Sequence, residues 1–317
     1  MRILRHTRAP AELAGAVLAL GNFDGVHRGH RAVIGRAREV AQRLGAPLGV
    51  LTFEPHPRSL FQPDAPPFRL TPFRSKAHLL AGLGLDLLVV TRFDRKMSQM
   101  LAQDFVLQVL VEGLKVRHLV VGYDFVFGAK RGGTPYVLDH MADMEGYGLT
   151  VVEPVAEGSD IFSSTLIRKH LAEGRPRAAA ELLGHWWEIE GHVRQGFRRG
   201  RTIGFPTANL TLGDYLRPAF GVYAVRAFLE HENRWIGGAA NLGRRPTVAG
   251  ETENLEVHLF DYQGDLYGKG MRVQLIEHIR PERKFSGLDE LKAQIAKDSE
   301  AARELLQRPW NALDRFV

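Results

Sequence analysis

The sequence predicts an α/β domain with a doubly wound parallel sheet, followed by a small β-barrel domain that ends in a helix. Two observations carry this prediction. Short apolar strands alternate with helical patterns in the first half of the chain, which is typical of a parallel sheet covered by helices. From Trp187 onward, strand patterns follow one another with glycine-rich turns at short intervals, which favours a small barrel.

Apolar runs predict five strands in the first half: Val17–Gly21, Leu48–Phe53, Leu85–Phe93, His118–Tyr123 and Leu149–Pro154. Helical spacing predicts a helix from about Gly29 that ends at Gly45, and further helices over Met100–Leu114 and Thr165–Leu183. The second half is predicted to hold strands at Glu188–Val193, Val222–Leu229, Trp235–Ala240, Leu255–Tyr262 and Met271–His278. A terminal helix follows, with Leu288, Leu291 and Ile295 on one face.

Composition limits the classes of protein that the chain can represent. Its 317 residues suffice for two domains, and it has no apolar run of about eighteen residues that could span a membrane. Met1–His6 lacks the apolar core of a signal peptide, and the absence of cysteine favours a cytoplasmic address. The net charge of +6 comes from scattered arginines, so we expect small anionic partners rather than nucleic acid. We expect a monomer or a weak homo-oligomer.

The most informative segment, Leu18–His30, joins the first predicted strand to the first predicted helix. Ligands of α/β sheets bind where such strands end, and a helix N-terminus offers N–H groups to phosphate. Glycines at positions 21, 25 and 29 permit close approach to the backbone. His27 and His30 fall on one face of the first helical turn. A zinc site would need further ligands, so this pattern indicates nucleotide phosphates bound by amides and imidazoles.

Three other segments of the first half lie where ligands are expected. Thr52–Pro57 follows the second strand and contains His56 between two prolines. Gly122–Gly133 combines Asp124 with a basic pair and glycines at a strand end, which suits a nucleotide with its magnesium. Asp124 either ligates magnesium or contacts adenosine. Phe162–Arg168 begins a helix with capping residues, and an arginine one turn later suits the outer phosphates of ATP.

The second half contains a motif that is more specific than a turn. Gly196, Gly200 and Gly204 suit a flexible loop over phosphates. Thr207 and Asn209 alternate in an extended segment, so that both oxygen-bearing side chains point the same way, as a magnesium site requires. Taken by itself, Glu256 is one charge on a strand, and such a residue is more often simply solvated.

These motifs resemble known families. Gly21-x-Phe-Asp-x-x-His-x-Gly-His30 resembles the signature of the nucleotidyltransferase superfamily, whose domain is Rossmann-like. Ser163-Ser-Thr-x-Ile-Arg168 resembles the second signature of the same transferase family. Gly200–Leu210 resembles the defining motif of riboflavin kinases. Asn241–Val248 and Glu256–Asp261 resemble later kinase motifs. Nearly the whole chain is therefore similar to the prokaryotic bifunctional riboflavin kinase/FAD synthetase family.

The resemblance implies two reactions, both with magnesium and with ATP as co-substrate. FMN adenylyltransferase (FAD synthetase) activity in residues 1–183 would convert FMN to FAD and pyrophosphate. Riboflavin kinase activity in residues 184–317 would convert riboflavin to FMN. His27 and His30 would steady the phosphates and the charge that develops at the α-phosphorus, and Glu256 would be the general base.

The remaining implied roles are contacts with ligands. Nucleotide contacts in the first half are implied for Gly21, Asn22, Phe23, Asp24, Gly29, Asp124, Arg131, Ser163, Ser164, Thr165 and Arg168. Nucleotide contacts in the second half are implied for Gly196, Gly200, Arg201, Gly204, Phe205, Pro206 and Thr207. Flavin contacts are implied for His56, Asn241 and Arg280, and magnesium ligands for Thr207, Asn209 and Asp124.

Two other functions remain open on the sequence. One is an adenylyltransferase of another small substrate fused to a non-catalytic barrel. Thr207, Asn209 and Glu256 argue against it, since a passive barrel needs neither metal ligands nor a base. The other is a nucleic-acid-binding protein, which the basic charge suggests and which would bind with steep salt dependence.

Overall fold

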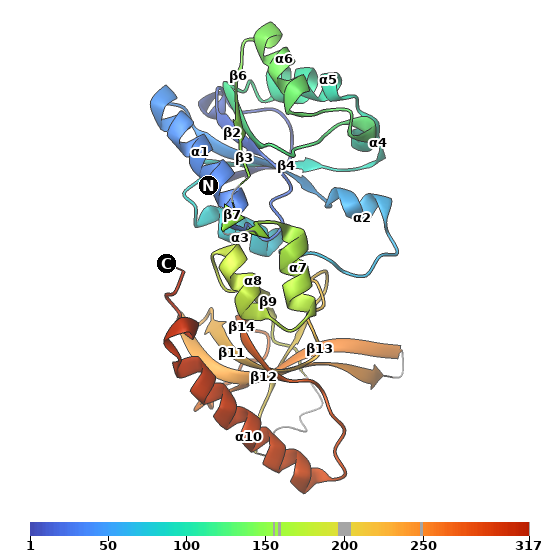
Figure 1. The fold of residues 1–317 in the computed structure, drawn as a ribbon, viewed down its shortest axis with the longest axis vertical. Helices are drawn as coiled ribbons and strands as arrows, with labels where there is room; N and C mark the ends of the chain where they lie inside the picture. Colours follow the sequence, from blue (N-terminus) through green and yellow to red (C-terminus); the bar gives the residue numbers. More distant parts are fainter. Residues whose placement is uncertain (155, 158–159, 196–203, 248–249, 317) are drawn as a thin grey trace. The chain divides into compact units, whose positions relative to one another are not determined.

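The computed structural model describes residues 1–154, 156–157, 160–195, 204–247 and 250–316 (Figure 1). The chain forms two compact units. The first comprises Met1–Pro66 and Thr71–Phe162, and the second comprises Pro67–Leu70 and Ser163–Val317. Each unit has its own sheet, and the predicted combination of an α/β fold with a small antiparallel β fold is confirmed.

The first unit contains a six-stranded parallel sheet in the order β1-β4-β3-β2-β5-β6. Its strands are β1 (Arg2–Leu4), β2 (Val17–Leu20), β3 (Leu48–Glu54), β4 (Leu87–Arg92), β5 (His118–Gly122) and β6 (Gly148–Val152). Five of them were predicted. The edge strand β1 was not, because three residues carry no periodic pattern. The strand order reverses beside β2, and open α/β sheets bind ligands at such a switch point.

The helices of the first unit are α1 (Arg28–Leu44), α2 (Pro57–Phe61), α3 (Phe73–Ala81), α4 (Arg95–Gln99), α5 (Ala102–Asp104) and α6 (Pro135–Glu145), with the 3₁₀ helices η1 (Ala11–Leu13) and η3 (Ala129–Arg131) and the π-helix η2 (Phe105–Gly113). Alternate strand residues enter two separate cores. Val17 and Ala19 pack with residues of α1 and α3, whereas Leu18 and Leu20 pack with residues of η2 and α6. The sheet is therefore covered on both faces, as predicted.

One helical prediction is confirmed with a shifted start, and another needed correction. The predicted helix over Met100–Leu114 is present as α5 followed directly by the π-helix η2, from Ala102 to Gly113. It starts two residues late because Met100 and Leu101 are extended, and the Met100 carbonyl accepts the N–H of Ala129 at 2.8 Å. The predicted helix over Thr165–Leu183 is split into α7 (Ser164–Ala172) and α8 (Pro176–Leu183). Gly174 is left-handed between them at φ +69°, and Pro176 stands at the first position of α8, where a missing N–H is tolerated. Gly45 ends α1 in the left-handed conformation, as predicted.

The second unit contains a six-stranded antiparallel sheet in the order β10-β13-β12-β11-β14-β9. Its strands are β9 (Glu188–His192), β10 (Ala208–Thr211), β11 (Gly221–Leu229), β12 (Arg234–Thr247), β13 (Gly250–Leu259) and β14 (Gly270–Arg280). The N–H of Arg194 donates to the carbonyl of Asn209 at 2.8 Å, so a bridge links the two ends of this order. The sheet is thereby nearly closed into a barrel. A short hairpin of β7 (Ala156–Glu157) and β8 (Asp160–Ile161) lies before α7.

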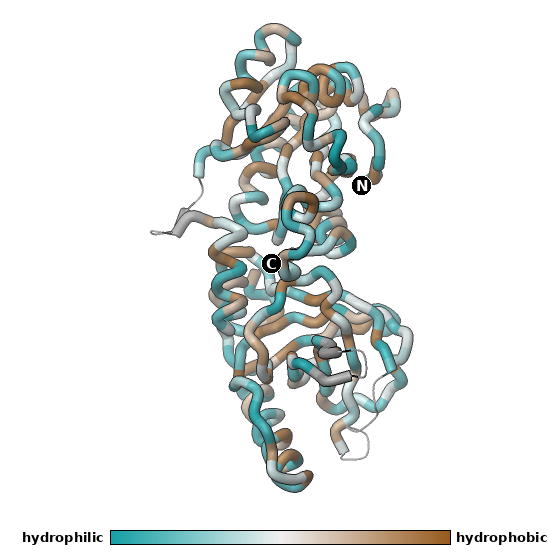
Figure 2. Tube along the Cα trace, turned by 90° about the vertical axis from the view of Figure 1, so that its right-hand side faces the viewer, coloured by the Kyte–Doolittle hydropathy of each residue, from teal (hydrophilic) through white to brown (hydrophobic). Residues whose placement is uncertain are grey.

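The helix α10 (Leu288–Gln307) packs on the sheet of the second unit through its C-terminal half, and the 3₁₀ helix η4 (Pro309–Asn311) follows it. Apolar and hydrophilic residues alternate along α10 (Figure 2). The buried residues continue the predicted face, since Asp298 and Ala302 lie seven residues after Leu291 and Ile295, but the N-terminal end of that face is open, with Leu288 54% exposed. Ala302 packs in a core cluster with Ala224 of β11. Only the C-terminal half of the helix contacts the sheet, so only residues of that half are buried.

Candidate functional site

The loop between β2 and α1 is held in an unusual backbone conformation. Phe23 and Val26 have positive φ angles of 49° and 44°, and Gly25 lies between them at 90°. A left-handed β-branched residue is rare, and such strain persists only where the surrounding structure enforces it. Both non-glycine side chains are buried. Strain of this kind clusters at ligand sites, so the backbone independently indicates the same loop as the sequence motif.

Thr71, which lies far from this loop in the sequence, stabilises it through hydrogen bonds. Asp24 is 2% exposed, and its Oδ1 accepts the backbone N–H of Thr71 at 2.9 Å and the hydroxyl at 3.4 Å. The Thr71 hydroxyl also accepts the N–H of Gly25 at 2.9 Å. Asp24, predicted to contact the nucleotide, therefore also helps to shape the loop.

The structure brings His27 and His30 together at the start of α1. His27 caps the helix, because its Nδ1 accepts the N–H of His30 at 3.3 Å. The two imidazole rings stack with centroids 3.6 Å apart, and Phe23 meets the His30 ring edge-on at 5.2 Å. Two groups that can donate hydrogen bonds thus lie side by side at a helix N-terminus, which suits an anion.

The glycines of this loop make room for its own rings. A Cβ on Gly21 would lie 3.2 Å from the Phe23 ring, and one on Gly29 would lie 3.2 Å from the His27 ring. The sequence argument invoked close approach of a ligand to the backbone. The contacts in the structure give a second reason for glycine at both positions, namely the packing of Phe23 and His27.

Two arginines at the start of α1 were missed by the sequence reasoning. The first turn of α1 reads Arg28-Gly29-His30-Arg31. Cations at a helix N-terminus oppose the helix dipole, which favours anions there. Burial and the charge of Arg28 lower the pKa of Arg31 below its usual value. A bound anion would compensate these positive charges, so this turn fits a polyphosphate. The sequence signal that could have identified both arginines is the basic composition of the first helical turn.

A row of aromatic side chains follows the carboxyl ends of β3 and β4. Ring centroids lie 6.0 Å apart for Phe61 and Phe93, 5.9 Å for Phe93 and Phe53, and 6.0 Å for Phe53 and Phe105. The row continues through Phe127. Phe61 is 65% exposed although it is large and apolar. An exposed ring backed by further rings can stack on a planar aromatic ligand.

Three other predicted residues of the first unit lie in loops at these strand ends. His56 caps α2, because its Nδ1 accepts the N–H of Arg58 at 3.1 Å. Asp124 is exposed in the loop after β5. Arg131 is exposed and has a positive φ of 60°. Their contacts with ligands remain predictions.

The predicted second signature lies at the start of α7, within the second unit. The Ser163 hydroxyl accepts the N–H of Leu166 at 3.2 Å, so the capping part of the prediction is confirmed. The Arg168 Nε donates to the carbonyl of Phe68 at 2.9 Å, and its guanidinium lies 5.6 Å from the Phe68 ring. Contacts of Ser164, Thr165 and Arg168 with phosphates remain predictions.

In the second unit, the sheet register aligns several predicted residues in one row. Asn209 of β10 is opposite Glu256 of β13, and Glu256 is opposite Asn241 of β12. The row continues through Val222 of β11 to Arg280 of β14. Cross-strand neighbours place their side chains on the same face with Cβ atoms about 5 Å apart. Residues separated by up to 71 positions, as Asn209 and Arg280 are, thus share one row.

Two neighbours of Glu256 on β13 hold the predicted nucleotide segment. Asn254 Nδ2 donates to Asn209 Oδ1 at 2.6 Å. His258 Nδ1 lies 3.0 Å from the carbonyl of Pro206, and the His258 ring meets Phe205 edge-on at 5.4 Å. Residues at alternate positions of a strand share a face. The sequence reasoning missed Asn254 and His258, whose period-two spacing around Glu256 was the available signal.

The other predicted nucleotide residues of the second unit are only partly described. Gly204, Phe205, Pro206 and Thr207 immediately precede β10, and Thr207 is partly buried. Their contacts with the nucleotide remain predictions. Gly196, Gly200 and Arg201 lie outside the residues that the structure describes.

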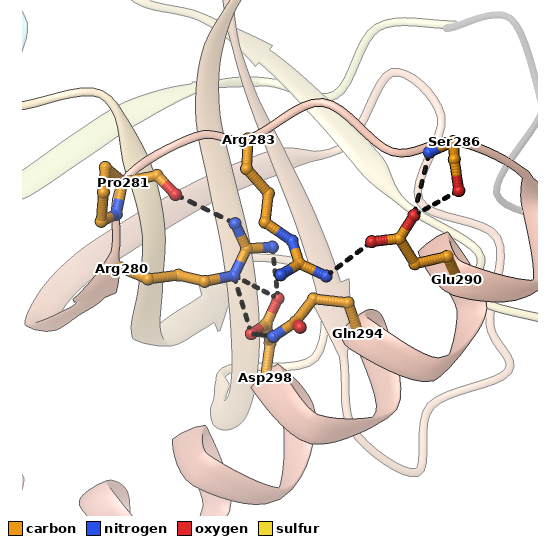
Figure 3. Close-up of polar contacts among 7 residues, drawn as sticks. All are labelled: Arg280, Pro281, Arg283, Ser286, Glu290, Gln294 and Asp298. Carbon is orange, nitrogen blue, oxygen red and sulfur yellow. Dashed lines mark hydrogen bonds and ion pairs between the residues drawn. The ribbon is translucent and has the colours of Figure 1, made fainter.

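Arg280 is engaged by the terminal helix (Figure 3). Its Nε lies 3.0 Å from Asp298 Oδ1, and its Nη2 lies 2.7 Å from Asp298 Oδ2. Gln294 donates to Asp298 at 2.7 Å, and Arg280 Nη1 donates to the carbonyl of Pro281 at 2.9 Å. A Cβ on Gly243 would meet the Glu282 carboxylate. The segment that follows Arg280 therefore reaches β12, two residues beyond Asn241.

The remaining features concern metals and membranes. Within the described residues, no three histidine, aspartate or glutamate side chains form a group that could hold a metal ion. The predicted magnesium ligands Thr207 and Asn209 are neither histidine nor carboxylate side chains, so that finding does not test them. None of the helices in the described part of the chain is long and apolar enough to cross a membrane.

Comparisons with known proteins agree with this division into two sites. A sequence model described as FAD synthetase matches residues 9–166, and one described as riboflavin kinase matches residues 183–306. The class is therefore a FAD synthetase domain followed by a riboflavin kinase domain. The chain is 46% identical over 307 residues to the bifunctional riboflavin kinase/FMN adenylyltransferase of Escherichia coli (strain K12), covering 96% of this chain and 97% of the relative. The chain belongs to the family of bifunctional riboflavin kinase/FMN adenylyltransferases.

Other relatives extend the likeness. The protein of the same description from Bacillus subtilis (strain 168) is 40% identical over 303 residues, covering 94% of each chain. A crystal structure titled as a macrolide-efflux protein from Streptococcus pneumoniae superposes with a TM-score of 0.84 at 29% identity, covering 95% of this chain and 98% of that one.

Proposed function

We propose that the protein makes FAD from riboflavin in two steps, one in each part of the chain. Residues 184–317 phosphorylate riboflavin with ATP to give FMN and ADP, and residues 1–183 transfer AMP from ATP to FMN to give FAD and pyrophosphate. Family membership over nearly the full length supports both activities. The observation that carries the proposal is that the histidine motif and the row of Asn209, Glu256 and Asn241 lie in two compact units, each with its own sheet.

In the kinase reaction, Glu256 takes the proton of the ribityl hydroxyl while its oxygen attacks the γ-phosphorus of ATP and ADP leaves. A carboxylate suits this role, and the loose transition state makes positioning the larger contribution. Asn241, opposite Glu256 in the register, orients the flavin. Arg280 contacts the flavin. Its hydrogen bonds to Asp298 and to the carbonyl of Pro281 hold the following segment at the same site.

Thr207 and Asn209 have the chemistry of magnesium ligands in the kinase reaction. Hard oxygen atoms are preferred by this ion. The Asn209 Oδ1 accepts one hydrogen bond from Asn254, which fixes the amide and leaves its second lone pair for a ligand. Bound magnesium neutralises phosphate charge. Gly204, Phe205 and Pro206 contact the phosphates, and the sequence motif adds contacts for Gly196, Gly200 and Arg201.

In the adenylylation reaction, a phosphate oxygen of FMN attacks the α-phosphorus of ATP and pyrophosphate leaves. His27 and His30 donate hydrogen bonds to the phosphate oxygens where charge develops, and the N-terminus of α1 adds its N–H groups. Arg28 and Arg31 supply positive charge in the same turn.

Further contacts with FMN and ATP are proposed for the same reaction. The aromatic row that ends at Phe61 stacks on the isoalloxazine ring, with His56 at the start of α2. Asp124 binds magnesium or adenosine, and Arg168 binds the outer phosphates. The remaining proposed nucleotide contacts are Gly21, Asn22, Phe23, Asp24, Gly29, Arg131, Ser163, Ser164 and Thr165.

We further propose a cytoplasmic protein that acts on small molecules as a monomer or a weak homo-oligomer and does not bind nucleic acid. The absence of cysteine and the scattered arginines support this proposal.

Crossed variants of the full-length protein test the assignment of the two sites. The protein is incubated with riboflavin, ATP and magnesium, and FMN and FAD are separated by chromatography. His30→Ala should accumulate FMN without FAD. Asn209→Ala should make no FMN from riboflavin but should still convert added FMN to FAD. A folded variant that lost both activities, phosphorylation of riboflavin and adenylylation of added FMN, would contradict the two-site proposal.

A further inference from the structure

The side chain of Lys76 on α3 is 0% exposed, and neither reaction accounts for it. A buried ammonium group is costly unless its three donors are satisfied. Its Nζ lies 2.8 Å from the carbonyl of Asn22, 3.3 Å from the Thr52 hydroxyl and 2.9 Å from Glu54 Oε1. Three acceptors for three donors make this a complete site rather than an incidental contact.

The acceptors of Lys76 belong to two different loops of the candidate adenylylation site. Asn22 immediately precedes left-handed Phe23, so the orientation of its carbonyl fixes the entry into the strained histidine loop. Glu54 ends β3 and precedes the His56 loop. The Thr52 hydroxyl donates to the same Asn22 carbonyl at 3.1 Å. One buried charge therefore ties the loop that carries the histidines to the loop proposed to border the flavin.

We propose that Lys76 is a positioning residue for FMN adenylylation, which sets the histidine loop and the His56 loop in their reactive arrangement. This inference rests on the proposed adenylyltransferase site. Lys76 acts through Asn22 and Glu54 and does not contact the reacting atoms. A displacement of about 1 Å in a reacting group can cost about 100-fold in rate. Loss of the tether should therefore lower turnover more than substrate affinity.

Steady-state kinetics of full-length Lys76→Met test the proposal, since methionine keeps the length of the side chain and removes the charge. We expect kcat for FMN adenylylation to fall about 10–100-fold. The KM values for FMN and ATP should change less than about threefold. Riboflavin phosphorylation, measured in the same preparation, should be unchanged. Lys76→Arg keeps a buried cation with several donors and should recover part of the loss. His78→Ala, an exposed position on the same helix, is the matched control.

Thr52→Val separates a positioning role from a general loss of stability. It removes the second donor to the Asn22 carbonyl without removing a charge, and it should lower kcat in the same direction by a smaller factor. It also decides the question if Lys76→Met does not fold. An unchanged kcat in folded Lys76→Met, or in Thr52→Val, would overturn the proposal. A wild-type protein that makes no FAD would instead overturn the proposed function.

Discussion

The ion pair between Arg280 and Asp298 permits a quantitative prediction for Asp298→Asn. Asparagine keeps the shape of the side chain, removes its charge and turns an amide donor toward a guanidinium. Breaking a fully buried pair costs about 3–5 kcal/mol. The side chains of Arg280 and Asp298 are 20% and 7% exposed, so water can partly solvate the arginine again. We therefore expect the unfolding free energy of the second unit to fall by about 2–3 kcal/mol.

Tryptophan fluorescence isolates this effect, because Trp186, Trp187, Trp235 and Trp310 are the four tryptophans of the chain and all lie in the second unit. For a unit of this size, a loss of about 2–3 kcal/mol lowers the thermal midpoint by about 4–12 °C. Glu300→Gln is the matched control, since it removes one carboxylate from an exposed position on the same helix.

A midpoint of Asp298→Asn equal to that of Glu300→Gln would refute the reasoning. The double variant Arg280→Met with Asp298→Leu gives a further check. Replacing both partners of a buried pair by apolar groups is often close to neutral. The double variant should therefore be more stable than Asp298→Asn, and a lower midpoint would show that the stability comes from another interaction.

Three further predictions concern the second unit. Glu256→Gln should lower riboflavin phosphorylation by about 10²–10⁴-fold while calorimetry shows little change in binding of ATP with magnesium; unchanged turnover would exclude the base. Burial lowers the pKa of His278, partly offset by its hydrogen bond to Phe220. The resulting stability is present above the unfolded pKa of about 6.5 and is lost as pH falls toward the folded value. The thermal midpoint detected by tryptophan fluorescence should therefore drop on acidification, and it should drop less in His278→Gln. An equal drop in His278→Gln would show that the assignment to His278 is wrong. A fragment of residues 163–317 should unfold at a higher temperature than one of residues 184–317, because Ala180 packs with Trp186 and Ile276, and equal midpoints would count against this packing.

Patterns with a fixed local period predicted the fold well. The buried strands of the first sheet appear as apolar runs, because both faces of a parallel sheet are covered. Gly45 ends α1 where the sequence indicated, because glycine adopts the left-handed conformation without a steric penalty. The late start of the helix after Met100 and the break at Gly174 were not predicted. Met100 is extended to meet Ala129, a contact across 29 residues of sequence.

The candidate residues followed a similar division. The histidine motif and the Thr207–Asn209 segment were predicted from residue type and spacing, because the chemistry of phosphate and magnesium restricts which side chains can serve. Glu256 was predicted only through the family resemblance. Contacts made by long-range folding, such as Lys76 with Asn22, were invisible. Lysine at an isolated helical position carries no local signal that it will be buried.

The sequence by itself determined the two-part organisation, the chemistry of each part and most strand positions, because these depend on composition, period and local motif. Tertiary structure alone decided how much of the apolar face of α10 is buried, and it alone brought Asn209, Glu256 and Asn241 into one row. Strand register and helix docking depend on contacts between distant segments. A one-residue slip of register would turn Glu256 to the opposite face, and the residues around Glu256 do not by themselves specify which partner strand, or which register, the fold will select.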